Sequence, residues 1–259
     1  YEIRNCDWSS DVCSSDLDST ANVYVKYRDT AGNVSTCISD DISHSDTLGY
    51  QQKKYLKAAN ISSGDLFGGS VAISGDTVIV SAISEDSNQT SITNGSSAST
   101  DDSSTDTGAV YVYRQNGANW VQEAYIKASN ADSNDKFGAS IAIDNDTMVV
   151  SAEGEDSDET FITNGSSSSS NNDETDSGAV YVYRRSGTTW TQEAYLKASD
   201  SGTGNSFGKS VDISGDSIVV GSTAMEAAYV FKRTGSTWVE EAILTPPNNG
   251  GDHGWSVGI

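Results

Sequence analysis

A repeat of 70 residues constrains this chain of 259 residues more than any other feature. The pairs Phe67-Gly68, Phe137-Gly138 and Phe207-Gly208 follow one another at that spacing, and each pair opens a similar alternating segment. Self-similarity at a fixed period indicates a repeat architecture, in which each copy is one unit packed against its neighbours. We therefore interpret the chain as copies of one supersecondary unit.

Each copy contains four short apolar or alternating segments, and none shows helical periodicity. In the first copy they are SVAIS at 70–74, TVIVSA at 77–82, AVYVYR at 109–114 and WVQEAYIKA at 120–128. The turn Gly75-Asp76 joins the first two segments, as in a tight hairpin. The pattern predicts an all-β fold, a partial β-propeller of about three four-stranded antiparallel blades in an open arc. We expect the recurring Phe, Tyr and Trp residues to pack between blades.

These motifs resemble the FG-GAP repeat, the blade unit of integrin alpha-chain heads, and above all its variant in large bacterial surface and secreted proteins. The resemblance runs from residue 50 to residue 259, so we assign 49–259 to a propeller fragment. Two features depart from the family: Ser81-Ala82-Ile83 replaces the Gly-Ala-Pro element, and a two-residue turn stands where the integrin-type calcium loop D-x-D-x-D-G-x-x-D belongs. That calcium site does not transfer to this chain.

The N-terminal part differs from the repeats. Residues 22–36, NVYVKYRDTAGNVST, resemble the last hairpin of an immunoglobulin-like or fibronectin-like domain, with the turn at 29–32. We interpret 18–48 as the remnant of such a β-sandwich followed by the linker SDDISHSDTLG. Residues 7–17, DWSSDVCSSDL, match the translation of a sequencing-library adapter, so we interpret 1–17 as an artefact; the alternative is a native segment with a Cys6–Cys13 bridge. Without that segment Cys37 stands alone, which supports neither a disulfide framework nor a zinc site.

The net charge of −22 disfavours binding to nucleic acid or to anionic membrane surfaces. No apolar run approaches the ~20 residues of a membrane helix, so we expect no membrane insertion in this fragment. Abundant Ser, Thr, Asn, Asp and Gly with few Cys suit an extracellular or cell-surface bacterial protein, and would also suit a halophilic one. The two histidines, His44 and His253, lie in no catalytic motif, so we expect no enzyme activity.

Two acidic loops are the candidate site. EDSNQTSITNGSS begins at Glu85 and EDSDETFITNGSS at Glu155, and both lie between the second and third predicted strands. From Val80 to Tyr111 is 31 positions, but from Val220 to Tyr229 only nine, so the third copy lacks 22 residues. The segment ITNGSS is identical in both loops although core positions differ, and Asn-Gly favours a hairpin turn, so we expect a small ordered hairpin in each.

Calcium binds six to eight oxygen ligands, and each loop offers carboxylates at both ends. We predict calcium ligands at Glu85, Asp86, Asn88 and Asp106, and at Glu155, Asp156, Asp158 and Asp176. The alternative is a hydrated, mobile loop. The function that we expect is a non-enzymatic extracellular adhesion or ligand-binding module, whose partner is a protein or carbohydrate ligand on the cell surface or matrix. The alternatives are the scaffold of a polysaccharide-acting enzyme with its active site elsewhere, or a structural spacer.

Overall fold

The computed structural model describes residues 21–25, 38–42, 54–60, 62–247 and 253–259. The chain divides into two compact units, Tyr1–Lys53 and Lys54–Ile259. In the described part of the chain there are only strands and turns. That part accordingly contains no helix long and apolar enough to cross a membrane.

The first unit contains one antiparallel pair, β1 (Ala21–Val25) and β2 (Ile38–Ile42), in which Ala21 lies opposite Ile42 and Val25 opposite Ile38. Part of the predicted linker, residues 39–42, is therefore a strand, which corrects the sequence interpretation. ISDDI forms this strand because its backbone hydrogen bonds go to β1. The proposed turn at 29–32 and the adapter-like residues 1–17 lie outside the described residues.

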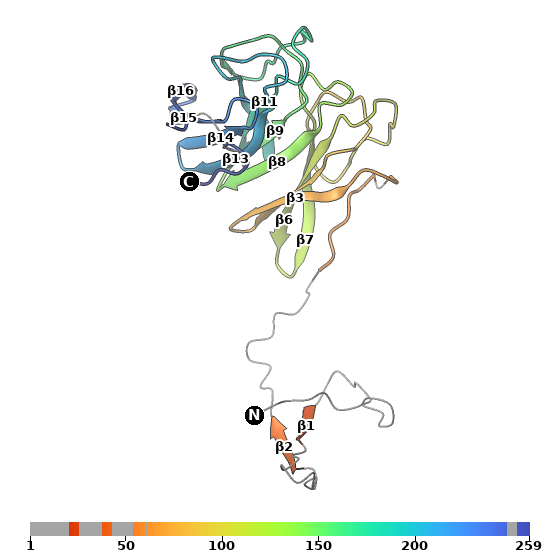
Figure 1. The fold of residues 1–259 in the computed structure, drawn as a ribbon. Coiled ribbons are helices and arrows are strands. Elements are labelled where there is room, and N and C mark those ends of the chain that lie inside the picture. Colours follow the sequence, from red (N-terminus) through yellow and green to blue (C-terminus); the bar gives the residue numbers. More distant parts are fainter. Residues whose placement is uncertain (1–20, 26–37, 43–53, 61, 248–252) are drawn as a thin grey trace. The chain divides into compact units, whose positions relative to one another are not determined.

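The second unit contains three antiparallel sheets, which confirms the prediction of an all-β fold made of propeller blades (Figure 1). We call them blades 1, 2 and 3. Blade 1 consists of β3 (Phe67–Ser74), β4 (Thr77–Ala82), β6 (Ala109–Asn116) and β7 (Asn119–Ile126). Blade 2 consists of β8 (Phe137–Asp144), β9 (Thr147–Ala152), β11 (Ala179–Ser186) and β12 (Thr189–Leu196). Blade 3 consists of β13 (Phe207–Ser214), β14 (Ser217–Ser222), β15 (Ala227–Thr234) and β16 (Thr237–Leu244).

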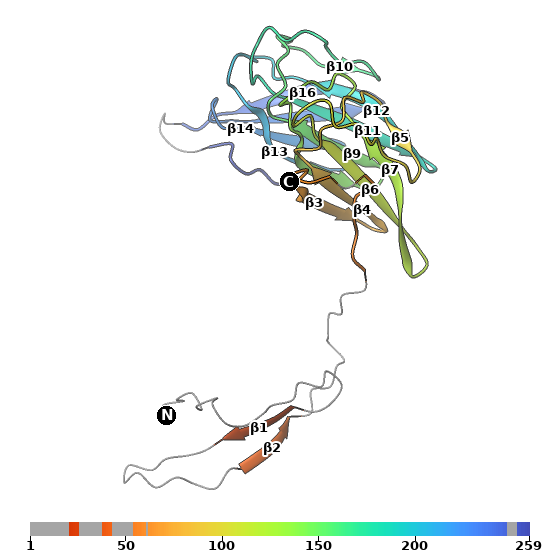
Figure 2. The same cartoon turned by 90° about the vertical axis from the view of Figure 1, so that its right-hand side faces the viewer.

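Blades 1 and 2 each have a fifth, two-residue strand at the outer edge. These strands are β5 (Thr93–Asn94) and β10 (Thr163–Asn164), and Figure 2 shows them beside β7 and β12. Both belong to the acidic loops, which we call the first insert (residues 83–108) and the second insert (residues 153–178). Blade 3 has no such strand, because it lacks the insert.

The two-residue turns have the backbone conformation that their residues favour. Ser74 lies opposite Thr77 across the first turn, and Asp144 lies opposite Thr147 across the second. Gly75 has φ +57° and Asn145 has φ +53°, which is the left-handed region that Gly and Asn enter most easily. These turns therefore fix the register of the first two strands in each blade.

The core lies between the blades. Phe137 opens blade 2 and is fully buried in a cluster with Ile79 and Val112 of blade 1, and its ring meets Tyr181 edge-on at 5.3 Å. Phe207 has the same place between blades 2 and 3 and meets Tyr229 at 5.2 Å. The predicted packing of aromatic residues between blades is confirmed here, whereas the first-copy residues Phe67 and Trp120 are only half-buried.

The glycine after each of these phenylalanines allows the close approach of neighbouring blades. A Cβ atom on Gly138 would lie 2.8 Å from Cβ of Ser81 in blade 1, and one on Gly208 would lie 2.8 Å from Cβ of Ser151 in blade 2. Both glycines have φ near +95°. Any other residue would therefore clash with the preceding blade and strain its own backbone.

Candidate functional site: the two inserts

Each insert extends the sheet of its own blade. Thr93 pairs with Tyr125, and Asn94 pairs with Ala124, so β5 lies along the outer edge of β7. The expectation of ordered structure in the inserts is confirmed, but the predicted hairpin turn at Asn94-Gly95 is wrong. The N–H of Gly95 donates to the carbonyl of Glu123 at 2.6 Å, because the partner strand is β7 and not a second arm of the loop.

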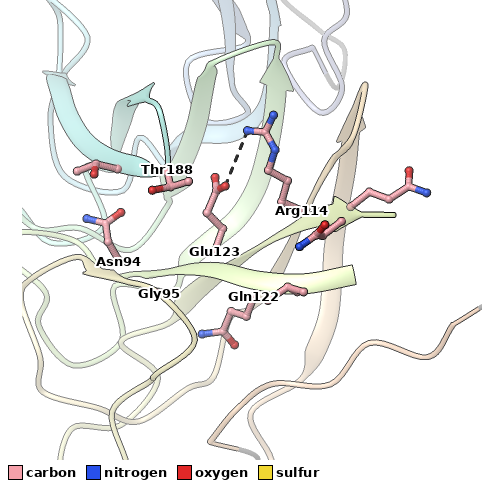
Figure 3. A pocket seen from close by; sticks show the side chains of 10 residues that line it. Asn94, Gly95, Arg114, Gln122, Glu123 and Thr188 are labelled. Carbon is pink, nitrogen blue, oxygen red and sulfur yellow. Dashed lines mark ion pairs between the residues drawn. The ribbon is translucent and has the colours of Figure 1, made fainter. Parts of the chain in front are cut away.

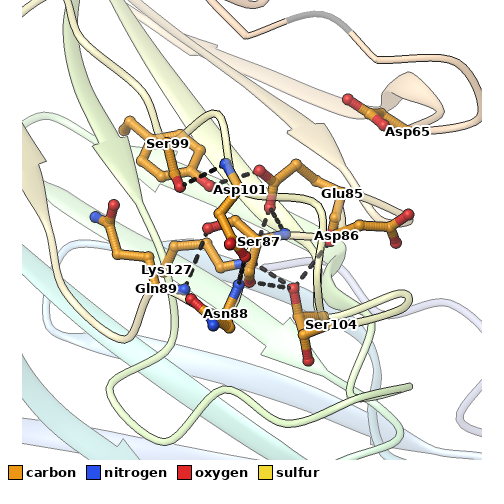
Figure 4. Close-up of polar contacts among 12 residues, drawn as sticks. Asp65, Glu85, Asp86, Ser87, Asn88, Gln89, Ser99, Asp101, Ser104 and Lys127 are labelled. Carbon is orange, nitrogen blue, oxygen red and sulfur yellow. Dashed lines mark hydrogen bonds and ion pairs between the residues drawn. The ribbon is translucent and has the colours of Figure 1, made fainter.

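Glu85, at the start of the first insert, is buried and fully hydrogen-bonded (Figure 4). Its Oε1 accepts from the hydroxyl of Tyr125 at 2.7 Å and from Nδ2 of Asn60 at 2.9 Å. Its Oε2 accepts from Nζ of Lys127 at 2.8 Å and from the N–H of Ser87 at 3.2 Å. This carboxylate therefore anchors the insert to the outer strand of the blade.

Lys127 holds both ends of the insert. It is 1% exposed, and its ammonium also donates to Oγ1 of Thr107 near the end of the insert, at 2.5 Å. The Thr107 hydroxyl in turn reaches the carbonyl oxygens of Glu85 and Ser87, both at 2.9 Å. Burial lowers the pKa of Lys127, and the Glu85 carboxylate opposes that shift. The lysine and Glu85 thus form one buried ion pair inside a closed hydrogen-bond network.

The second insert repeats the principal contacts of this network. Glu155 accepts from Tyr195 at 2.7 Å, from Asn130 at 3.0 Å and from Lys197 at 2.9 Å. Ser177 replaces Thr107 as the further acceptor for the lysine. We call the two sets of four side chains the Glu–Lys clusters; they consist of Glu85, Lys127, Tyr125 and Asn60, and of Glu155, Lys197, Tyr195 and Asn130.

Blade 3 has neither the insert nor the cluster. Ile243 and Thr245 stand where the other blades have Tyr and Lys, and Asp200 stands where they have Asn60 and Asn130. Asp200 accepts from the hydroxyl of Tyr229 at 2.7 Å, as the Asn side chains do from Tyr111 and Tyr181. A carboxylate is tolerated there because no Glu faces it. The sequence analysis missed the tyrosine, lysine and asparagine of the clusters. The signal for two of them was E-A-Y-x-K-A, which recurs at 123–128 and 193–198 and is replaced by E-A-I-L-T-P at 241–246 in blade 3.

The other predicted calcium ligands lie on the outer part of each insert. Oδ1 of Asp86 accepts from the N–H of Asp106 at 2.8 Å, and Oδ1 of Asp156 accepts from the N–H of Asp176 at 2.7 Å. Asp158 accepts from Nδ2 of Asn171 at 3.0 Å. Asn88 donates its N–H to Asp101 at 3.2 Å. The structure thus brings the two ends of each insert together.

Calcium binding itself stays a prediction. Among the described residues no group of three or more His, Cys, Asp or Glu side chains is arranged to hold a metal ion. Glu85 and Glu155 already have lysine partners, at 2.8 and 2.9 Å. A cation at either insert would therefore have to use the outer carboxylates.

Each insert also holds the following blade. Oδ1 of Asn94 accepts from the N–H of Trp190 at 2.7 Å, and Nδ2 of Asn94 donates to the carbonyl of the same residue at 3.2 Å. Asn164 makes the same two bonds to Trp238, at 2.7 and 3.2 Å. We call these paired bonds the Asn clasps. They explain why the asparagine of ITNGSS is the same in both inserts: each clasp needs the donor and the acceptor of one amide.

A second polar contact between blades lies beside each clasp. Arg185 stacks on Trp190 with 5.4 Å from its guanidinium carbon to the ring centroid, and it donates to Glu123 of blade 1 at 3.3 Å. Arg233 repeats this on Trp238 and donates to Glu193 at 3.1 Å. Both guanidinium groups are nearly buried, so the charge pairs bind neighbouring blades in a defined orientation.

The described residues contain one histidine, His253, and it is exposed. The hydroxyls of Thr107 and Ser177 lie beside a lysine, but each of these lysines is buried in an ion pair with a glutamate. The most strongly shifted carboxyl group is Asp135, at the boundary of blades 1 and 2, where burial raises its pKa to about 8. Its Oδ2 accepts from the N–H of Asp132 at 2.8 Å. The equivalent residue in blade 3 is Asn205, which fits a structural role for this position.

Four-stranded antiparallel sheets that repeat along the chain and bury their aromatic residues against one another define a protein built from β-propeller blades. The FG-GAP repeat matches residues 50–113, 120–183 and 190–231, and the chain belongs to the FG-GAP repeat family. The second match runs from the outer strand of blade 1 into the third strand of blade 2, so it contains a whole blade boundary. No curated protein matches the chain.

Proposed function

We propose that this chain is a non-enzymatic ligand-binding module of an extracellular bacterial protein, in which the blades are the scaffold and the inserts are the recognition surface. FG-GAP propellers are generally non-catalytic binding modules. The observation that carries the proposal is the Glu–Lys cluster, because it fixes a loop of variable outer residues on a rigid sheet. Binding residues are found disproportionately on loops that a rigid scaffold positions.

The outer residues of the inserts differ where the anchoring residues do not. Phe161 projects from the second insert with 59% of its surface exposed, whereas the first insert has Ser91 at that position. An exposed aromatic side chain on an anchored loop is a favourable contact for a partner. Phe161 is therefore the residue of the inserts that we expect to contribute most to binding.

The experiment is capture of purified bacterial cell envelopes and of immobilised extracellular-matrix proteins by the full chain. We expect capture of at least one of these preparations, reduced by Phe161→Ser, which copies the first insert. The control is Val239→Thr on β16, another exposed apolar residue, which copies Thr191 of blade 2 and should leave capture unchanged. Capture of neither preparation, or equal loss in both variants, overturns the proposal.

The calcium part of the proposal rests on Asp86, Asn88 and Asp106 with their counterparts Asp156, Asp158 and Asp176. Calorimetric titration of the full chain with calcium tests it. We expect heat of binding and a higher melting temperature, both reduced in Asp106→Asn. If millimolar calcium produces neither heat nor a thermal shift, the inserts do not bind this ion.

A further inference from the structure

Two equivalent cavities lie at successive blade boundaries. The first, of about 580 Å³, lies between blades 1 and 2 and is lined by Arg114, Gln122 and Glu123, by Asn94-Gly95 of the first insert, and by Thr188-Thr189 of blade 2 (Figure 3). The second, of about 470 Å³, has Arg184, Gln192 and Glu193, Asn164-Gly165 and Ser236-Thr237 at the corresponding places. Both volumes lie in the range of ligand sites. The repeat thus builds the same cavity twice.

Each cavity has a carboxylate with one oxygen left for a ligand. Oε1 of Glu123 accepts from Nε1 of Trp190 at 2.9 Å and from Arg185, whereas Oε2 lies 3.8 Å from the guanidinium of Arg114 and accepts no hydrogen bond from the described residues. In the second cavity Oε2 of Glu193 pairs with Arg233 at 3.1 Å, and its Oε1 has no such partner there.

The remaining wall groups mix donors and acceptors. Arg114 pairs with Asp76 at 3.0 Å but keeps 37% of its side chain exposed, and Arg184 is exposed too. The amide nitrogen of Gln122 donates to the carbonyl of Ser97, and that of Gln192 donates to the carbonyl of Ser167. The charges of one guanidinium and one carboxylate cancel in each cavity, although the net charge of the whole chain is −22. A site without net charge, lined by amide, hydroxyl, guanidinium and carboxylate groups, favours a neutral ligand that both donates and accepts hydrogen bonds, as a ligand rich in hydroxyl groups does.

We propose that each cavity binds a segment of a neutral polysaccharide, and that the two cavities hold successive segments of one polymer. The inference rests on the proposed function, because it names the ligand class of a binding module. A repeating polymer suits a repeated site: once the first cavity is occupied, the second binds at a high effective concentration. The Asn clasp forms one wall of each cavity, so the inserts shape these sites as well as joining the blades.

Affinity electrophoresis of the full chain tests the proposal, in native gels that contain dextran, a soluble β-1,3-glucan or a galactomannan, with alginate as the anionic comparison. We expect at least one neutral polymer to retard the chain and alginate to leave it unaffected. Arg114→Gln or Arg184→Gln alone should weaken polymer binding on the order of tenfold or more. The double variant should abolish retardation. A short oligosaccharide occupies one cavity at a time, so either single variant should lose about half of the oligosaccharide-binding sites per chain.

Lys232→Gln is the matched control, because Lys232 has the same place in blade 3 and lines neither cavity. Equal weakening by Lys232→Gln, or retardation by none of the neutral polymers, overturns the proposal. If no polysaccharide retards the chain while Phe161→Ser still reduces capture of a matrix protein, the polysaccharide site fails and the binding module stands. If capture and retardation both fail, both proposals fail. Thermal melts confirm that each variant is folded.

Discussion

At the scale of single residues, the most informative feature is the buried pair of Glu85 with Lys127. A buried ion pair contributes little net stability over apolar residues, but removal of one partner leaves an uncompensated charge. The geometry excludes water from both groups, since Glu85 and Lys127 are each 1% exposed. The pair therefore specifies where the insert attaches more than it raises the overall stability.

We expect Glu85→Gln to lower the free energy of unfolding by about 3 kcal/mol, because Lys127 stays buried without its counter-charge. The double variant Glu85→Gln with Lys127→Met should recover more than half of that loss. Urea denaturation at neutral pH measures both effects. Asp102→Asn, on the exposed side of the same insert, is the control and should change stability by less than about 0.5 kcal/mol. An equal loss in Glu85→Gln and in the double variant would contradict the ion-pair account.

Asp135 predicts how stability depends on pH. Burial raises its pKa to about 8 in the folded chain, and an unfolded chain has the ordinary value near 4. Between these values the folded state holds one proton that the unfolded state lacks, so this residue contributes stability at low pH that is lost as the pH rises toward 8. Asp135→Asn, which copies Asn205 of blade 3, should gain stability over the wild type as the pH rises from 5 to 8. The measurement is the melting temperature of the wild type and of Asp135→Asn at each pH. If the difference between the two melting temperatures stays constant from pH 5 to 8, the assignment is wrong.

At the scale of elements, the strands could be predicted and the attachments of the inserts could not. TVIVSA and AVYVYR alternate or are continuously apolar, and the predicted strands agree with β4 and with the start of β6. The structure extends the first strand of each blade back to the phenylalanine across an irregular register, as between Phe67 and Val71. The two-residue strand β5 has no periodicity to detect, and its partner Tyr125 lies 32 positions away in the sequence.

The site was predicted only in part for the same reason. Acidic residues at both ends of a loop are visible in a sequence, and the structure does bring Asp86 to Asp106. The lysine that neutralises Glu85 follows directly after β7, 42 positions later, and in the sequence it looks like an ordinary surface residue. In the sequence, the link between Glu85 and this lysine is visible only in blade 3, where the tyrosine, the lysine and the insert are absent together.

From the Asn clasp we predict that replacing a single side-chain amide by a carboxylate weakens the boundary between two blades. Asn94→Asp replaces the Nδ2 donor by a carboxylate oxygen that faces the carbonyl of Trp190. Asn94 is itself exposed, so we expect a loss of about 1 kcal/mol, because a hydrogen bond across the boundary is replaced by a repulsion between two oxygens. Hydrogen exchange of β12 should accelerate more than that of β3 or β4. Asn88→Asp, an exposed change in the same insert, is the control, and faster exchange spread evenly over blade 1 would argue against a boundary effect.

At the scale of the molecule, stability resides at the boundaries between blades. Each of the two described boundaries combines a buried phenylalanine, an Asn clasp and an Arg–Glu pair. Gln115 replaces the boundary arginine in blade 1, where no described blade precedes it. On that face Val71 and Ile73 are 63% and 65% exposed, whereas the equivalent Ile141 and Ile143 of blade 2 are 6% and 9% exposed. One sequence pattern thus has two environments in one chain.

This difference gives a prediction in which the chemistry of the substitution is held constant. Ile143→Thr removes a buried side chain from the boundary of blades 1 and 2 and should cost about 2 kcal/mol or more. Ile73→Thr makes the same change on the exposed face and should cost less than about 0.5 kcal/mol. Exposed apolar patches promote association. Where the wild type self-associates at high concentration, Ile73→Thr should therefore lower the apparent mass measured by light scattering. Urea denaturation of both variants decides the matter: equal costs would mean that Ile73 is covered in solution, and that blade 1 buries the same face as blade 2.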